Sequence, residues 1–300
     1  MPLWIAIVVL GIIEGITEFL PISSTGHLLI AEHISWLPRQ SDLFNIVIQC
    51  GAVLAVLPLF PNRLQQFAFR WREPATQDYL LKIFVAFALT CVGGYILDKK
   101  EFKLPETLQP VAVAMFVGGV LFILVEGWLR GKTLREQVTW SMALAVGFAQ
   151  LVAAVFPGTS RSGSTILIAL LLGLNRVAAT EFTFLVGIPT MLAAGGWKIL
   201  KALHHPANAP SEHWGMVALG FIVSAVVSFI AVKWLLRYVQ THTFVAFGWY
   251  RIALALVIVV VLLAHPAAQP SKRETAGPAL RPRLISPQPG RVSLYHLPAV

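Results

Sequence analysis

The sequence has 300 residues, of which 57% are hydrophobic and only 12% are charged. Since a soluble globular domain carries about 25% charged residues, this composition excludes an ordinary soluble enzyme and indicates a protein embedded in lipid. The formal net charge of +9 does not indicate nucleic-acid binding, because the basic residues lie in short loops and a tail rather than along one folded face. We expect no nucleic-acid partner.

Long apolar runs follow one another along residues 1–265 and predict a single all-α integral membrane domain. A bilayer span needs about 17 to 25 predominantly apolar residues. Six runs meet this length: 43–60, 78–97, 107–128, 178–200, 214–236 and 244–264. Two other runs, 2–20 and 138–155, are each followed by a polar stretch and a short apolar run, 28–37 and 165–174. Because neither short run can span, the sequence predicts two re-entrant helix hairpins beside six transmembrane helices.

The two predicted hairpins contain an internal repeat. Residues 11–25 and 147–161 both fit the pattern G-x-x-[EQ]-x6-P-x-[ST]-S. Three predicted spans separate the hairpins, so the second hairpin enters from the opposite face of the membrane. This predicts an inverted-topology repeat, with repeat one at about 1–130 and repeat two at about 131–265, and a site near the midplane at the repeat interface. If the hairpins spanned the membrane, the repeats would be parallel instead.

Loop charges and the end of the chain suggest an orientation and a boundary. The loops at 61–77 and 129–137 are basic, which the positive-inside rule interprets as cytoplasmic, leaving both termini outside. The loop at 98–106 is also basic and weakens this signal. Residues 266–300 combine many prolines with scattered arginines and lack apolar periodicity, which predicts a disordered tail.

Two carboxylates stand out in the first apolar run. Glu14 and Glu18 are four residues apart and therefore share one face of a helix. Carboxylates at membrane depth are costly unless they are paired, protonated or coordinated. We interpret them as a divalent-cation site or a general base, because hard cations such as Mg²⁺ bind carboxylate and phosphate oxygens. The alternative is a helix end that reaches the membrane surface.

The polar stretch after Pro21 contains Ser23, Ser24 and His27. Ser24 and His27 are three residues apart and would share a face at the start of a helix. A hydroxyl beside an imidazole is the minimal activated nucleophile, whereas a serine alone at this place would cap the helix. The spacing leaves three nucleophiles open: Ser24, His27, or a water activated by Glu18.

The second polar stretch, residues 157–165, reads P-G-T-S-R-S-G-S-T. Small residues expose the backbone, hydroxyls donate and a helix N-terminus follows, which is the composition of a phosphate-binding site. Arg161 adds a planar donor matched to phosphate oxygens, and its cost at membrane depth argues for a functional partner. Other polar residues within the spans are interpreted first as structural hydrogen-bonding groups: Asn45, Gln49, Glu181 and Arg251.

At these motifs the sequence resembles the undecaprenyl-diphosphate phosphatase family of the bacitracin-resistance type. The resemblance is carried by E-G-I-T-E-F-L-P-I-S-S-T-G-H at 14–27 and P-G-T-S-R-S-G-S-T at 157–165. E-F-T-F-L-V-G-I-P beginning at Glu181 and W-Y-R ending at Arg251 support it. It covers about 1–265 and does not include the tail.

The resemblance implies hydrolysis of undecaprenyl diphosphate to the monophosphate at the outer face of the bacterial plasma membrane, with Mg²⁺ or Ca²⁺. This reaction recycles the lipid carrier of peptidoglycan synthesis and confers bacitracin resistance. The resemblance also implies an inverted-repeat fold, contact with membrane lipids, and a homodimer. It further implies that Glu14 and Glu18 are the metal-binding and general-base carboxylates, and that Ser24 is the candidate nucleophile with His27 as its partner. The implied phosphate-binding set is Arg161, Ser160, Ser162, Thr165 and Ser23.

Two other functions compete with this interpretation. Inverted repeats with re-entrant hairpins are commoner in transporters, so a lipid-carrier flippase or ion-coupled transporter is the main alternative. Transport alone does not require Ser24 and His27 beside paired carboxylates and opposite an arginine. A lipid phosphatase of the phosphatidic-acid-phosphatase type also uses Ser-Gly-His and Ser-Arg elements, but its Lys-Arg-Pro element and late His-Asp pair are missing from this sequence.

Overall fold

The computed structural model describes residues 2–33, 40–100, 102, 107–204 and 213–264. The predicted tail at 266–300 lies outside the described residues. In the described part of the chain every regular element is a helix, and one isolated bridge pairs Arg135 with Leu174. The α-helices are α1 (Leu3–Thr17), α2 (Ser24–His33), α3 (Asp42–Val56), α4 (Pro61–Phe69), α5 (Pro74–Lys99), α6 (Leu108–Trp128), α7 (Trp140–Val155), α8 (Arg161–Leu171), α9 (Arg176–His204), α10 (Trp214–Thr241) and α11 (Val245–Ala264).

The predicted all-helical membrane fold is confirmed. Among the described residues, five helices are long and apolar enough to cross a membrane: α5, α6, α9, α10 and α11. A sixth span is present if α3 and α4 are counted as one broken span. The helices α1, α7 and α8 are apolar but have only 15, 16 and 11 residues. They are shorter than the roughly 20 residues of a full span, as the hairpin prediction requires.

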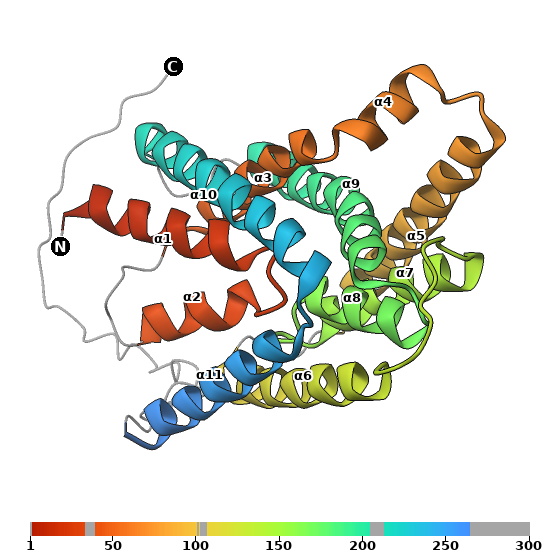
Figure 1. Ribbon diagram of the computed structural model, residues 1–300. Helices are drawn as coiled ribbons and strands as arrows, with labels where there is room; N and C mark the ends of the chain where they lie inside the picture. Colours follow the sequence, from red (N-terminus) through yellow and green to blue (C-terminus); the bar gives the residue numbers. More distant parts are fainter. Residues whose placement is uncertain (1, 34–39, 101, 103–106, 205–212, 265–300) are drawn as a thin grey trace, which may run out of the picture. The chain divides into compact units, whose positions relative to one another are not determined.

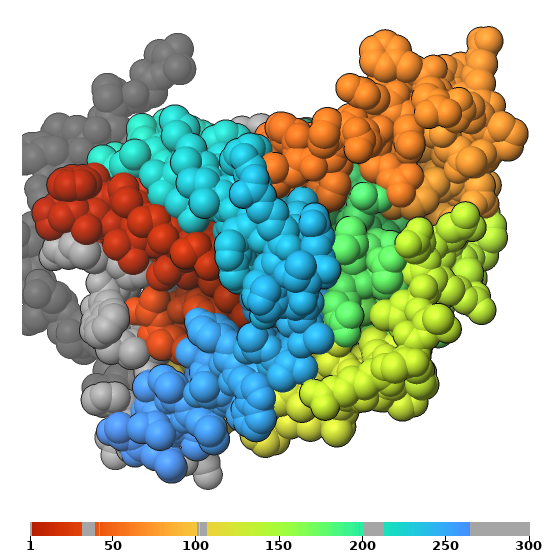
Figure 2. Space-filling model, in the orientation of Figure 1, coloured from red at the N-terminus to blue at the C-terminus, as the bar shows by residue number. Residues whose placement is uncertain are grey.

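The predicted span at 43–60 differs from a single helix. α3 ends at Val56, a short 3₁₀ turn covers Leu57–Leu59, and α4 leaves at an angle of 79°. Pro58 and Pro61 explain the break, because a proline lacks the N–H donor and its ring clashes with the preceding helical turn. Figure 2 shows the result: α4 and the first part of α5, in orange, stand out from the rest of the molecule.

Helices α1 and α7 pack on different partners. α1 lies along α10, and α7 lies along α5. The α1–α10 contact is close because Gly15 has no side chain, and a Cβ there would lie 2.7 Å from the Ser224 carbonyl oxygen. Figure 1 shows α1 and α2 on the side where α10 begins and α11 ends, with α7 and α8 nearer α5. The re-entrant character of the hairpins and the inverted relation of the repeats stay predictions.

Two ion pairs join helix ends away from the two motifs. Glu126, 1% exposed, accepts two hydrogen bonds from Arg176 Nε, at 2.9 and 3.1 Å, and one from the Phe244 amide, at 2.8 Å. Glu181 accepts from Arg63 Nε at 2.6 Å, which ties α4 to α9. The bonding of Glu181 fits its interpretation as a structural group.

Candidate functional site

The two polar motifs form turns with the same backbone geometry. Ser23 has φ 71° and Ser160 has φ 68°, and they are the only non-glycine residues with positive φ in the described part of the chain. The Ser23 hydroxyl accepts from the Gly26 amide at 3.4 Å, and the Ser160 hydroxyl from the Gly163 amide at 3.1 Å. A left-handed conformation is costly for a residue with a side chain and is concentrated at functional sites.

This geometry corrects the register of the repeat. The sequence pattern aligns Ser24 with Ser160, but the capping role aligns Ser23 with Ser160, so the second motif has one extra residue between proline and cap. The pattern could not show the shift, because the cap is defined by backbone conformation rather than by residue type. Ser24 and Arg161 therefore occupy equivalent places, each as the first residue of its helix.

Contacts between the turns bring the two motifs into one site. The Ser162 hydroxyl donates to the Leu20 carbonyl at 3.1 Å, and Arg161 Nη2 lies 3.5 Å from Glu18 Oε1. Both charged side chains are mostly buried, at 15% and 6% exposed. The Glu18 carboxylate of one hairpin therefore faces the Arg161 guanidinium of the other.

The predicted carboxylate pair is buried and in mutual contact. Glu14 is 2% and Glu18 is 7% exposed, and the Glu14 carboxyl group interacts electrostatically with Glu18 one helical turn away. Gln49 Nε2 also donates to Glu18 Oε2 at 3.2 Å. Glu14 Oε1 has no hydrogen-bond partner. Two buried carboxylates one helical turn apart repel each other when both are charged, and Arg161 offsets only the charge of Glu18, so the pair favours a shared proton or a bound cation.

Ser24 is paired with a carboxylate rather than with the imidazole that its spacing suggests. Its hydroxyl donates to Glu18 Oε2 at 2.9 Å. His27 instead bonds the Ser23 carbonyl through Nδ1, at 2.8 Å, and the Tyr250 hydroxyl through Nε2, at 2.7 Å. Since a carbonyl only accepts, Nδ1 carries the proton and Nε2 accepts from Tyr250. The His27 and Tyr250 rings are also stacked, with an interplanar angle of 8°.

Most of the predicted phosphate-binding hydroxyls take part in the fold itself. Ser23 and Ser160 cap their helices, and Ser162 bridges to the other turn. Thr165 Oγ1 donates to the Arg161 carbonyl at 2.7 Å. Of the predicted set, Arg161 is the group best placed to bind an anion, because its Nη1 is buried and without a partner.

Gly187 makes room for Arg161. A Cβ at this position of α9 would overlap Arg161 Nη1. The guanidinium also lies 5.7 Å from the centre of the Phe19 ring. Gly187 and Tyr250 were not among the predicted site residues, although both lie in the segments V-G-I-P and W-Y-R that supported the family resemblance.

A divalent cation would rely on few protein ligands. The described residues contain no group of three or more His, Cys, Asp or Glu side chains suited to a metal. The Glu14–Glu18 pair nonetheless fits a hard cation, because it supplies carboxylate oxygens and one of them is buried without a partner.

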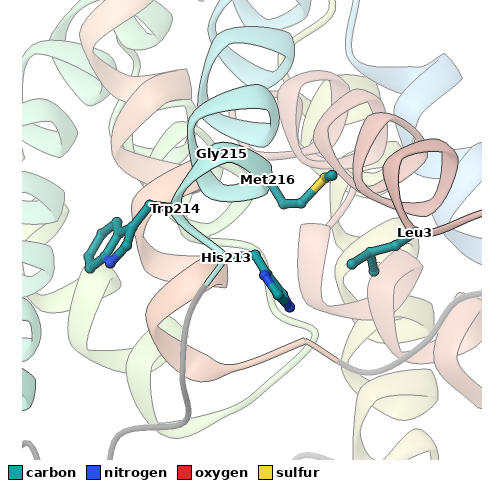
Figure 3. A pocket seen from close by; sticks show the side chains of 5 residues that line it. All are labelled: Leu3, His213, Trp214, Gly215 and Met216. Carbon is teal, nitrogen blue, oxygen red and sulfur yellow. The ribbon is translucent and has the colours of Figure 1, made fainter.

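A pocket elsewhere on the molecule has different chemistry. Figure 3 shows it near the first residues of α1 and α10, lined by Leu3, His213, Trp214, Gly215 and Met216. At about 1.5 Å per residue, Leu3 lies roughly 20 Å along α1 from Glu18. The pocket has no carboxylate or arginine among its lining residues, so it is not the candidate site.

The family of the chain follows from comparison with known proteins. The model of the family described as bacitracin resistance protein BacA matches residues 7–257, which include both motifs. The chain belongs to this family. Among its relatives, an undecaprenyl-diphosphatase of Rhizobium etli is 52% identical over 251 residues, covering 83% of this chain and 94% of the relative. An undecaprenyl-diphosphatase of Xanthomonas oryzae pv. oryzae is 51% identical over 265 residues, covering 88% and 98%.

Proposed function

We propose that this BacA-family chain is a membrane phosphatase that hydrolyses undecaprenyl diphosphate to undecaprenyl phosphate and inorganic phosphate. The observation that carries the proposal is that Glu18 contacts both the Ser24 hydroxyl and the guanidinium of Arg161, whose Nη1 has no partner. A hydroxyl hydrogen-bonded to a carboxylate, opposite a guanidinium with one unpaired nitrogen, suits attack on a phosphate group. The names of the Rhizobium and Xanthomonas relatives support the same substrate.

In the proposed reaction Ser24 attacks the terminal phosphorus of the lipid diphosphate. A bond forms between Ser24 Oγ and phosphorus, the bond to the bridging oxygen breaks, and the lipid monophosphate leaves. The Ser24 proton moves to Glu18 Oε2, its hydrogen-bond acceptor. Glu18 passes this proton to the departing monophosphate. A water then attacks the phosphoserine phosphorus and gives a proton to Glu18, the bond from phosphorus to Ser24 Oγ breaks, Glu18 returns the proton to Ser24, and inorganic phosphate leaves. The alternative is direct attack on the phosphorus by a water that Glu18 activates. His27 has both ring nitrogens engaged in hydrogen bonds and is assigned a positioning role.

The remaining groups of the site have proposed roles in binding. Arg161 binds the transferred phosphate through Nη1, and its interaction with Glu18 keeps the guanidinium close to Ser24. Glu14 and Glu18 are the proposed ligands of Mg²⁺ or Ca²⁺, with substrate oxygens completing the coordination. When bound, such a cation neutralises charge on the phosphate oxygens.

The cellular setting is proposed on the basis of the family resemblance. The apolar helices make this a multi-pass membrane protein. We place it in the bacterial plasma membrane as a homodimer, with the site open to the outer face, where the lipid carrier would be recycled for cell-wall synthesis. A flippase or ion-coupled transporter is the rival function, but transport alone does not explain the Ser24–Glu18 hydrogen bond opposite Arg161.

The proposal is tested by phosphate release from purified protein in detergent. With C55 or C15 diphosphate and Mg²⁺ or Ca²⁺, the wild type should release inorganic phosphate, and Arg161→Ala and His27→Ala should each lose most of that activity. A wild type that moves the lipid across vesicle membranes without releasing phosphate would favour the transporter. Unchanged turnover in both variants would contradict the site assignment.

Removal of divalent cations should stop the reaction. We expect phosphate release to fall to background in excess EDTA and to return when Mg²⁺ or Ca²⁺ is added, because the two buried carboxylates would otherwise repel the substrate phosphates. Equilibrium binding of ⁴⁵Ca²⁺ to the wild type and to Glu14→Gln provides a readout besides activity. Full activity after exhaustive chelation would show that the Glu14–Glu18 pair shares a proton instead.

Tyr250→Phe should have a smaller and specific effect. The phenylalanine keeps the stacked ring but removes the hydrogen bond to His27 Nε2, so kcat should fall about 2- to 10-fold, in line with one hydrogen bond. Tyr95→Phe, on the exposed surface of α5, is the matched control. Site-specific labelling of His27 by diethyl pyrocarbonate, followed by mass spectrometry, should be faster in Tyr250→Phe. Equal labelling rates would exclude the proposed hydrogen bond.

A further inference from the structure

Arg251 of α11 is a buried cation with an unusual set of partners. It is 0% exposed, and all five hydrogen bonds of its guanidinium go to backbone carbonyl oxygens. The acceptors are Pro21 at 3.2 Å, Gly158 at 3.2 Å, Thr159 at 3.1 Å, Ala114 at 3.2 Å and Met115 at 3.4 Å. No carboxylate is among them, so the cation is satisfied by peptide dipoles alone.

These acceptors belong to three separate segments. Pro21 lies in the first hairpin turn, just before the left-handed Ser23, and Gly158 and Thr159 lie in the second turn, just before the left-handed Ser160. The remaining two acceptors are in α6. Arg251 Nη1 bonds the first turn and Nη2 bonds the second, so one rigid planar group spans both.

We propose that Arg251 is a positioning residue that holds the two turns at a fixed separation and so places Ser24 opposite Arg161. The inference deepens the proposed function and rests on it, because Ser24 and Arg161 are the groups that would act on one phosphate. Each is the first residue of the helix that follows its turn, so a shift of either turn moves one of them directly. A misplacement of about 1 Å costs on the order of 100-fold in rate.

The surroundings of Arg251 are shaped for a guanidinium. A Cβ at Gly118 of α6 would overlap Arg251 Nη2, and a Cβ at Gly163 would lie 3.4 Å from Nη1. A lysine fits the same space but carries a single compact ammonium with three donors, so it cannot reach both turns in the same plane. The site therefore depends on the fork-like geometry of arginine and not only on its charge.

The first test compares Arg251→Lys and Arg251→Met with the wild type. We expect kcat for phosphate release from C55 diphosphate to fall about 100-fold in both. KM should change less than about threefold, because Arg161 and its turn still bind the phosphate. Hydrogen exchange measured by mass spectrometry should speed up in peptides covering 20–24 and 157–160 and stay unchanged in α5. This exchange readout needs no activity, so it tests the positioning role even if the wild type proves not to be a phosphatase.

The second test uses a glycine pair in α6. Gly118→Ala should lower kcat roughly tenfold or more by displacing Arg251, whereas Gly127→Ala, which meets no atom within 4 Å, should be neutral. In the Arg251→Lys background Gly118→Ala should lower kcat little further, because lysine lacks the Nη2 atom that the added methyl group would displace. Wild-type kcat in Arg251→Lys, unchanged exchange at both turns, or equal costs of Gly118→Ala in the two backgrounds would overturn the proposal.

Discussion

Glu18→Gln is expected to lower kcat for phosphate release by about 100- to 10,000-fold, the range typical of a lost general base. The substitution keeps the size of the side chain but removes the acceptor charge for the Ser24 hydroxyl and the counter-charge for Arg161. It also removes one of the two proposed metal ligands. Three roles of one side chain are lost together, which makes this the largest effect that we predict.

The matched control is Glu73→Gln, because Glu73 lies in a surface turn away from the site and pairs with Arg70 there. Both variants should keep a thermal midpoint close to that of the wild type in detergent, since glutamine can still accept from Ser24 and Gln49. Near-normal kcat in Glu18→Gln would show that Ser24 is not activated by this carboxylate. The nucleophile would then have to be sought at His27.

Gly187→Ala is expected to lower kcat/KM by roughly 100- to 1,000-fold, the cost of losing one donor that stabilises charge in the transition state. The added methyl group would overlap Arg161 Nη1, the atom proposed to bind the phosphate. The guanidinium must move away, which takes Nη1 from the place where the phosphate would bind. A single methyl group outside the two motifs should therefore act like a substitution of Arg161.

Gly196→Ala in the same helix is the control, because a Cβ there meets no atom within 4 Å. It should leave phosphate release unchanged and can stabilise α9 slightly, since alanine favours a helix over glycine by about 1 kcal/mol. In an Arg161→Lys background Gly187→Ala should cost much less than in the wild type, because lysine has no Nη1. Equal activity of Gly187→Ala and Gly196→Ala would show that Arg161 tolerates displacement.

The helical membrane fold could be predicted because its signals are local. Apolar runs of span length predict transmembrane helices from composition alone, and five of the six predicted spans are single long helices in the structure. The span at 43–60 is broken because Pro58 and Pro61 prevent a continuous helix, although the run is mostly apolar. The homodimer, the cation and the orientation depend on groups outside one chain and stay predictions.

Residues 14–27 and 157–165 could be chosen as the candidate site because charged and hydroxyl side chains are costly within apolar runs, and that cost is visible in the order of residues. The partners of these side chains could not be chosen in the same way. Ser24 bonds Glu18 and leaves His27 to Tyr250, because the left-handed Ser23 turns the start of α2 in a direction that helical spacing does not encode. Contacts made across more than 200 residues of chain, such as Tyr250 to His27 and Arg251 to Pro21, exist only once the helices have packed.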